Sequence, residues 1–394
     1  MTRTAAERER LVFAARVSFL FAALAAVIGT NMPFLPVWLD WAGLTPSEIA
    51  IVTATPLLVR VAVTPAIAFA ADRAGDHRTF LIGLAWLGLA GLLALAQSRG
   101  FWPILVFTIV FSLSWTTNMP LAETVAMSGV KAAGLDYGRM RLWGSLSFIA
   151  ASLAGGWVIQ VLGAASAIWL IVAASLLVVV AAHALPPPIG QGRLRAATGP
   201  PRLSLADATG LVRSRIFLIF LAAGGLTSAS HAVLYTFGTL HWRAQGLSTG
   251  WSGTLWAISI VAEVALFAWS AAAVARAGPV GLVALGAGAS LLRWLVMGLD
   301  PPLAVLVPLQ LLHAATFGAT HIGAIHFIGR TVPETQAGTA QALYASVTGG
   351  IAMGAAMLAA GPLYAAYAGG AYWAMAVLAG AGLAASLVLL RARP

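Results

Sequence analysis

Ionisable side chains are scarce in this chain, and eight of them stand inside long apolar stretches. Carboxylates and imidazoles can exchange protons in such surroundings, whereas an arginine keeps its positive charge and can bind a carboxylate. Charge in a hydrocarbon environment is costly, so each of these residues is a candidate for function. They are Arg60, Glu123, Glu263, Arg293, His231, His313, His321 and His326.

These residues do not form a recognisable catalytic motif. The histidines His313, His321 and His326 are spread around a helix, and no HExxH places two metal ligands on one face. The sequence has no cysteine and no Walker-type phosphate loop. We therefore expect no metal, no cofactor and no ATP-driven step, and a membrane enzyme or sensor is kept as the alternative of a different class.

The elements that carry these residues are long and apolar. Hydrophobic residues make up 60% of the chain and charged residues only 9%. A helix needs about 20 apolar residues to cross a hydrocarbon core of roughly 30 Å. The sequence therefore predicts an all-α integral membrane protein with twelve transmembrane helices, at approximately 11–39, 46–71, 79–98, 102–129, 136–162, 164–185, 214–241, 249–275, 279–299, 302–328, 335–361 and 369–390.

The distribution of Lys and Arg supports this topology, because positive charge prefers short cytoplasmic loops. With the N-terminus inside, only Arg99 and Arg243 of the 22 basic residues fall in outer segments. We expect a multi-pass protein of the cell inner membrane that acts as a monomer, with both termini cytoplasmic. The net charge of +10 reflects this topology and gives no support for nucleic-acid binding.

The chain consists of two similar halves. Gly43-Leu44-Thr45 recurs as Gly246-Leu247-Ser248, and Arg73-Ala74-Gly75 recurs as Arg276-Ala277-Gly278, both at a spacing of 203 residues. A Pro/Gly-rich basic segment, 186–204, separates the halves. The sequence predicts a six-helix bundle over 1–185, a cytoplasmic linker over 186–204 and a pseudo-symmetric bundle over 205–394, with a binding cavity between the bundles.

The same spacing relates Arg60 in the second helix to Glu263 in the eighth. Opposite charges at equivalent positions, each half-way across the membrane, suggest two walls of one cavity. Arg60 lies roughly 20 Å into its helix at 1.5 Å per residue. An alternative for Arg60 is a structural ion pair, or a cap on carbonyls freed by Pro56 and Pro65.

Two further pairs have both a functional and a structural interpretation. Glu123 and Arg141 lie at similar depths in consecutive helices, where they form either a functional ion pair or a purely structural salt bridge. Arg293 and His313 lie toward the outer half and either relay protons or include a packed, hydrogen-bonded histidine.

Several passages resemble the major facilitator superfamily. The loop Ala71–Arg78 is similar to its signature between the second and third helices, with Asp72, Arg73, Gly75 and Arg78 as the signature residues. Similarity to the proton-coupled lactose permease group, and more closely to the phenylpropionic acid permease family, extends from about residue 15 to 390. It is carried by MPLAETVAMSGVKAAGLDYGRMRLWGSLSFI, STGWSGTLWAISIVAEVALF, LLRWLVMG and LLHAATFGATHIGAIHFI.

The resemblance implies roles for individual residues. From the lactose permease group it carries substrate contact and coupling to Glu123, Arg141 and Glu263, and proton-linked roles to Arg293 and His313. This chain departs from that group at Thr316, where the sugar permease has its main proton-carrying glutamate. Arg60 is shared with the phenylpropionate family and not with the sugar permease, which weakens a sugar assignment.

These observations together predict a secondary transporter that imports a small organic anion, an aromatic carboxylate such as a phenylpropionate, with protons and no cofactor. Arg60 is the expected anchor for the carboxylate. The alternatives are a proton symporter for a neutral sugar or nucleoside and, less favoured, a drug/proton antiporter. The remaining residues expected at the substrate are Asn118, which is equivalent to His321, and three aromatic side chains able to stack on a ring: Phe148, Trp256 and Tyr344.

Overall fold

The computed structural model describes residues 5–185 and 205–392. The predicted linker over 186–204 and the chain ends, 1–4 and 393–394, lie outside the described residues. The described chain is helical and has no strand. It divides into two compact units: unit 1 takes the described residues of Met1–Leu44 and Val59–Pro200, and unit 2 takes those of Thr45–Leu58 and Pro201–Pro394.

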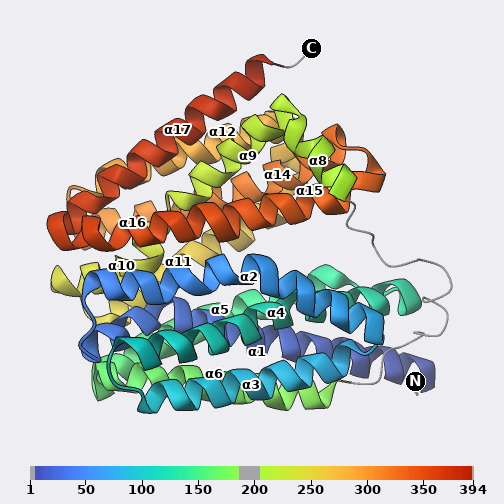
Figure 1. Cartoon of the computed structure of the whole chain (residues 1–394), viewed down its shortest axis with the longest axis horizontal. Helices are drawn as coiled ribbons and strands as arrows, with labels where there is room; N and C mark the ends of the chain where they lie inside the picture. Colours follow the sequence, from blue (N-terminus) through green and yellow to red (C-terminus); the bar gives the residue numbers. More distant parts are fainter. Residues whose placement is uncertain (1–4, 186–204, 393–394) are drawn as a thin grey trace. The chain divides into compact units, whose positions relative to one another are not determined.

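Unit 1 is built from long helices that run alongside one another (Figure 1). α1 packs along α5 and α6, and α3 packs along α4 and α6. α2 contributes its first residues to unit 2 and the rest to unit 1. The elements are α1 (Ala5–Trp41), α2 (Pro46–Ala74), α3 (His77–Gln97), α4 (Phe101–Ala133), α5 (Tyr137–Leu162), η1 (Ala164–Ser166) and α6 (Ala167–Ala184).

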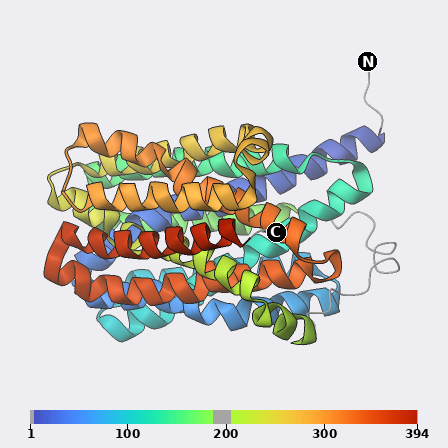
Figure 2. The same cartoon turned by 90° about the horizontal axis from the view of Figure 1, so that it is seen from above.

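Unit 2 has more breaks along its helices than unit 1, and Figure 2 shows the helices from above. Its elements are α8 (Leu205–Arg213), α9 (Arg215–Ala229), α10 (Ala232–Ala244), α11 (Thr249–Ala268), α12 (Ser270–Met297), α13 (Leu303–Leu311), η2 (Ala314–Ala319), α14 (Thr320–Thr331), α15 (Glu334–Ser346), η3 (Val347–Ile351), α16 (Ala352–Tyr367), η4 (Ala368–Gly370) and α17 (Ala371–Arg391). η2 and η3 are π-helical turns, which often occur at functional sites. Within the described residues, unit 1 has no such turn.

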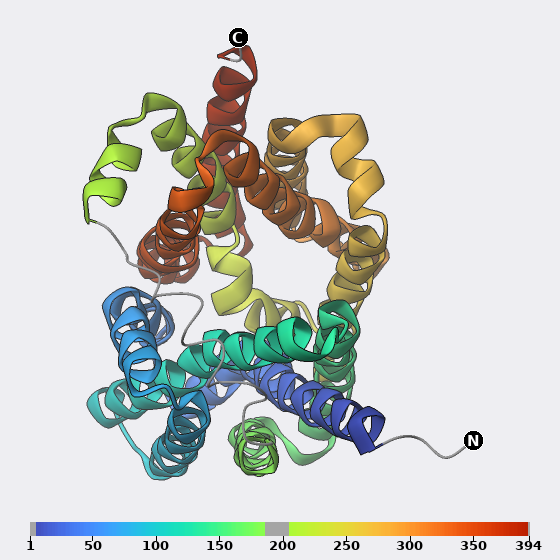
Figure 3. The ribbon, with the colours of Figure 1, turned by 90° about the vertical axis from the view of Figure 1, so that its right-hand side faces the viewer.

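The helix pairings of unit 1 are repeated in unit 2. α9 packs on α17 as α1 packs on α6, and α12 packs on α14 and α17 as α3 packs on α4 and α6. Figure 3 views the helices of both units from one end, with unit 1 largely in blue to green and unit 2 largely in yellow-green to red. The repeated pairings confirm the prediction of two bundles of the same design.

The backbone of the predicted repeat is also the same in both units. Gly43 and Gly246 both have φ 88°, and Gly75 and Gly278 both have φ 67°, values that favour glycine. The helices before the first pair end alike, because Leu44 N donates to Leu39 O at 3.1 Å and Leu247 N donates to Trp242 O at 2.9 Å. The 203-residue spacing is thus a spacing between equivalent turns.

The number of predicted spans is recovered, although several ends differ. Eleven candidate spans are found in the described residues, and the last, Glu334–Arg391, contains 58 residues. That span turns at η4, where Ala368 has φ 45°, so it comprises two membrane-crossing stretches, one made of α15, η3 and α16 and the other of α17. Two predicted continuous helices are interrupted by η2 and η3, and a third is broken at Ser230 and His231.

Candidate functional site

The signature loop between α2 and α3 is organised by hydrogen bonds. Gly75 turns the chain, and the Asp76 carboxylate caps α3 by accepting from Thr79 N at 3.0 Å. Arg78 donates through Nε to Leu185 O at 2.9 Å and through Nη2 to His183 O at 3.0 Å. Arg78 therefore ties the start of α3 to the end of α6.

The other two predicted signature residues lie at the end of α2. Asp72 accepts from His77 Nε2 at 2.8 Å, and Arg73 is exposed. Hydrogen bonds from Thr79, together with the charges of Arg78 and His77, hold the pKa of Asp76 below its usual value. The loop thus keeps a carboxylate in its charged form at the start of a helix, where the helix dipole also favours it.

Arg60 is half-buried in α2, between Pro56 and Pro65. The neighbouring Thr64 hydroxyl lies 3.1 Å from the Thr117 hydroxyl of α4, which fixes this part of α2 within unit 1. The guanidinium of Arg60 is therefore a partly exposed positive charge in the middle of α2.

A second polar group of unit 1 joins α4 to α5. The Tyr137 side chain interacts with both the Glu123 carboxylate and the Arg141 guanidinium, and the two charges attract each other. Arg141 also lies over the ring of Phe21, with Cζ 5.5 Å from its centroid. All three side chains are half-buried: Glu123, Tyr137 and Arg141. The group thus combines a carboxylate and a cation that are both partly exposed.

Gly144 leaves room for Arg141. A Cβ atom at Gly144 would lie 2.7 Å from Arg141 Nη1 and 3.4 Å from Phe21 O. The guanidinium therefore occupies a position that only a glycine on this face of α5 allows.

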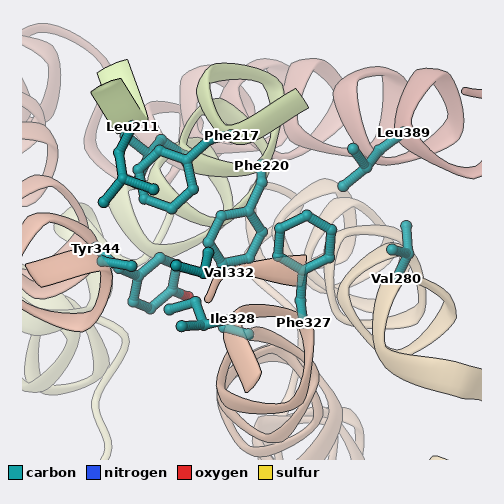
Figure 4. Packing of buried hydrophobic residues seen from close by; sticks show 12 residues of the cluster. Leu211, Phe217, Phe220, Val280, Phe327, Ile328, Val332, Tyr344 and Leu389 are labelled. Carbon is teal, nitrogen blue, oxygen red and sulfur yellow. The ribbon is translucent and has the colours of Figure 1, made fainter. Parts of the chain in front are cut away.

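The predicted aromatic residues are mostly buried in their own units. Phe148 is buried, and Trp256 donates through Nε1 to Thr239 Oγ1 at 3.1 Å. Tyr344 stacks on Phe220 at 5.1 Å between ring centroids, within the cluster shown in Figure 4. Asn118 is also buried, and its Oδ1 has no hydrogen-bond partner among the described residues.

A buried polar cluster lies in unit 2 around Arg293 on α12, a residue that is 0% exposed. Arg293 Nη2 donates to Gln310 Oε1 at 2.6 Å, and Nη1 donates to Thr316 Oγ1 at 3.4 Å. Its guanidinium also lies over the Trp294 ring, 4.8 Å from the centroid. Within the described part of the chain, Arg293 forms no ion pair with a carboxylate.

Arg293 and His313, which were predicted to pair, have different direct partners in the structure. His313 Nε2 lies 3.4 Å from Glu263 Oε2 of α11, and both side chains are largely buried. Arg293 interacts with His313 through its charge, and its direct partners are Gln310 and Thr316. Thus the structure brings together Glu263, Arg293 and His313, three of the four residues predicted to couple protons.

A stack of rings follows His313 along the tenth predicted span. The His313 ring is parallel to that of Phe317 at 5.4 Å, and the Phe317 ring is parallel to that of His321 at 6.1 Å. His321 also interacts with Glu263 through its charge. His326 is exposed on the same helix.

Sequence reasoning named His231 and Thr316 without predicting their contact, and it assigned no role to Ser259 or Gln310. Ser259 Oγ lies 3.2 Å from Gln310 Oε1, and His231 Nε2 lies 3.0 Å from Thr316 Oγ1. Serine, threonine and glutamine occur in membrane helices without a charge that would single them out. The signal that was present is the position of Gln310 and Thr316 at three residues on either side of His313.

Comparison with known proteins agrees with this architecture. The family model described as "MFS_1 like family" matches residues 15–375. A probable 3-phenylpropionic acid transporter of Escherichia coli (strain K12) is 32% identical over 306 residues, covering 76% of this chain and 78% of that protein. A maltose permease of Geobacillus stearothermophilus is 30% identical over 331 residues, covering 82% of this chain and 80% of that protein.

The fold is also found among solved structures. The crystal structure of the nucleoside transporter NupG matches with a TM-score of 0.82 at 18% identity, covering 96% of this chain and 98% of that one. The matching family model and the curated relatives, both transport proteins, identify the chain as a transporter of the major facilitator type. The chain belongs to the MFS_1 like family of the major facilitator superfamily.

Proposed function

We propose that this transporter is a proton symporter for a small organic anion, an aromatic carboxylate of the phenylpropionate type. The observation that carries the proposal is the buried Glu263–His313 pair beside Arg293, a cation without a carboxylate partner in the described residues. A carboxylate and an imidazole in contact can take up and release a proton. The printed name of the Escherichia coli relative supports the class of substrate.

In this proposal unit 1 binds the substrate and unit 2 carries the proton. Arg60 binds the substrate carboxylate, because its guanidinium is permanently charged and offers a planar pair of donors. Glu123 and Arg141 contact the substrate and couple its binding to the proton. Glu263 and His313 carry the proton. We also propose the predicted division of the chain into bundles over 1–185 and 205–394, with a cytoplasmic linker over 186–204.

We further propose that the protein acts as a monomer in the inner membrane, with both termini in the cytoplasm. The positive charge of the predicted cytoplasmic loops supports this orientation. Cysteines introduced at Gly134, between α4 and α5, and at Gly100, between α3 and α4, should react with a membrane-impermeant thiol reagent from opposite sides. Labelling of both from one side would refute the topology.

A second substrate class has its own support. Relatives named as a maltose permease and a putative nucleoside transporter cover more than half of this chain. Thermal shifts of the purified protein with 3-phenylpropionate, its amide, maltose and uridine at two pH values separate the classes. The proposal predicts stabilisation by the acid alone, whereas stabilisation by maltose or uridine and not by the acid would overturn it.

A further inference from the structure

We infer that His231 and Thr316 form a hydrogen-bond relay that positions Arg293 beside the Glu263–His313 pair. This inference rests on the proposed function, in which that pair carries the coupled proton. Neither residue has a charge to contribute in this arrangement. Their role follows from the direction of the hydrogen bonds that connect them.

The direction of the bonds is fixed by the groups at the two ends. Thr227 O is a carbonyl and only accepts, so His231 Nδ1, at 3.1 Å, must carry a hydrogen and donate. Arg293 only donates, so Thr316 Oγ1 accepts from it.

The remaining bond in the relay is then determined. The single hydroxyl hydrogen of Thr316 is directed at His231 Nε2, at 3.0 Å, and that nitrogen accepts. The competing acceptor, His313 O, lies farther away at 3.5 Å. The relay therefore runs from Arg293 through Thr316 and His231 to Thr227, and it requires the neutral imidazole with its hydrogen on Nδ1.

Local structure holds each part of the relay in place. His231 stands at the break between α9 and α10, and the adjacent Ser230 hydroxyl accepts from Trp294 Nε1 at 2.9 Å. Thr316 lies in the π-helical turn η2, and this turn begins directly after His313. His231 and Thr316 are both almost completely buried, so water does not compete for these bonds.

The cluster around the relay contains ionisable groups from several neighbouring elements. They are Tyr235 on α10, Glu263 on α11, Arg293 on α12, His313 beside η2, His321 on α14 and Tyr372 on α17. A second proton on His231 would turn the Thr316 bond around and add a positive charge beside Arg293. Removing the relay instead releases Arg293 from one of its two side-chain acceptors and changes its distance from His313.

The test compares Thr316→Val, which removes the hydroxyl at nearly constant volume, with Thr316→Ser, which keeps it. In proteoliposomes with 3-phenylpropionate as the probe, Thr316→Val should lower proton-driven accumulation at least about tenfold while exchange stays within about twofold of the parent. Its pH midpoint of uptake should move by about half a unit or more, and Thr316→Ser should behave like the parent. His231→Phe should repeat the Thr316→Val result.

A spectroscopic measurement on the parent tests the relay without a transport assay. The ¹⁵N spectrum of His231, assigned by its loss in His231→Phe, should show hydrogen on Nδ1 only and stay unchanged between about pH 5 and 8. A hydrogen on Nε2 would overturn the relay. So would a Thr316→Val variant that accumulates the acid with the pH midpoint of the parent.

The results that would refute the proposed function differ from those that would refute the relay. A parent protein that does not accumulate the acid under a proton gradient would remove the symport proposal. The ¹⁵N result would still decide the relay, because it needs neither the substrate nor the gradient.

Discussion

The polar groups of unit 1 and unit 2 differ in exposure and in chemistry, although the helices that carry them are repeated. In unit 1, Glu123 and Arg141 are half-buried charges that interact with Tyr137. In unit 2, Arg293 is completely buried among neutral acceptors, and Glu263 has a histidine as its partner. One helical template therefore holds a half-buried carboxylate and arginine in one copy and a buried arginine beside a carboxylate–histidine pair in the other.

This difference also has a backbone component. The helices of unit 2 contain two π-helical turns and a break at His231, and these irregular segments adjoin Thr316, Tyr344 and the relay. Regular helices suffice to present the charged side chains of unit 1. A network of directed hydrogen bonds needs positions that a regular helix does not offer, and irregular turns supply them.

The largest effect is expected from Glu263→Gln, which removes the carboxylate that we propose as proton carrier. Proton-driven accumulation of 3-phenylpropionate should be abolished, while exchange of the substrate across the membrane is retained. Uptake and counterflow in proteoliposomes distinguish the two. Glu334→Gln, at an exposed carboxylate of α15, is the matched control and should transport like the parent.

Uphill transport by Glu263→Gln at the rate of the parent would move the proton carrier to another residue. The double variant with Glu123→Gln would then be measured, because Glu123 is the carboxylate of the corresponding group in unit 1. Persistence of uphill transport in the double variant would end the proposed assignment of roles to the two units.

The next effect concerns the permanent charges of unit 1. Arg60→Gln should weaken binding of 3-phenylpropionate at least about tenfold, because removing one partner of a buried charged pair costs about 2–5 kcal/mol. Arg60→Lys should recover only part of the affinity, since a lysine lacks the planar pair of donors. Calorimetry on the purified variants gives the affinities, and Arg99→Gln, at an exposed arginine, is the control.

A folded Arg60→Gln protein that binds the acid as tightly as the parent would make Arg60 a structural residue. Circular dichroism establishes that the variants are folded. In that case Arg141 becomes the remaining candidate for the anchor within unit 1.

Close packing of the helices around the unit 2 cluster predicts a stability effect. A Cβ atom at Gly286 on α12 would collide with Thr320 Oγ1 and come within 2.9 Å of Ala315 O, next to Thr316. Gly286→Ala should therefore destabilise the protein by about 1–3 kcal/mol. Gly288→Ala, two residues further along the same helix, would meet nothing within 4 Å and should be neutral or slightly stabilising.

Unfolding of both glycine variants in detergent, followed by tryptophan fluorescence, measures this difference. Equal unfolding midpoints for Gly286→Ala and Gly288→Ala would show that the approach of α12 to η2 is not tight. The constraint on Arg293 and Thr316 would then come from their hydrogen bonds alone.

The smallest effect is expected at the signature loop of unit 1. Asp76→Ala should cost about 1 kcal/mol at neutral pH through loss of the α3 cap. The pKa of Asp76 is lowered in the folded protein, so its stabilising charge is present above about pH 4 and is lost as the pH falls through that lowered pKa. The difference between Asp76→Ala and the parent should therefore shrink in acid.

Asp76→Asn provides the control for this pH dependence, because asparagine also caps helices but does not titrate. Its stability should depend less on pH than that of the parent in the acid range, as measured by unfolding between about pH 3 and 7. An Asp76→Asn protein with the full acid dependence of the parent would show that other groups are responsible.

The sequence predicted the architecture well because membrane spans and glycine turns have strong local signals. The 203-residue spacing pointed to Gly43 and Gly246 and to Gly75 and Gly278, which share their backbone angles. The charged candidates also stood out, since charge in an apolar span is rare. Their depth along the helices paired Arg293 with His313 but placed Glu263 half-way across as the counterpart of Arg60, and its contact with His313 emerged only from the structure.

The partners of these residues could not be predicted in the same way. Which atoms meet depends on helix rotation and on π-helical turns, neither of which has a clear pattern in a single sequence. Gln310 and Thr316 are neutral, and the predicted direct pair of Arg293 and His313 passed over both. Tyr344 was predicted to stack on a substrate ring, and it lies stacked on Phe220 in the core of unit 2.

Proton movement driven by the substrate tests the central claim most directly. Proteoliposomes containing a trapped pH-sensitive dye receive 3-phenylpropionate at about pH 7.5, where very little of a carboxylic acid is neutral and able to cross the lipid unaided. The parent protein should acidify the lumen faster than empty liposomes, and Glu263→Gln should not. Acidification by Glu263→Gln at the rate of the parent, or none by the parent, would contradict the account.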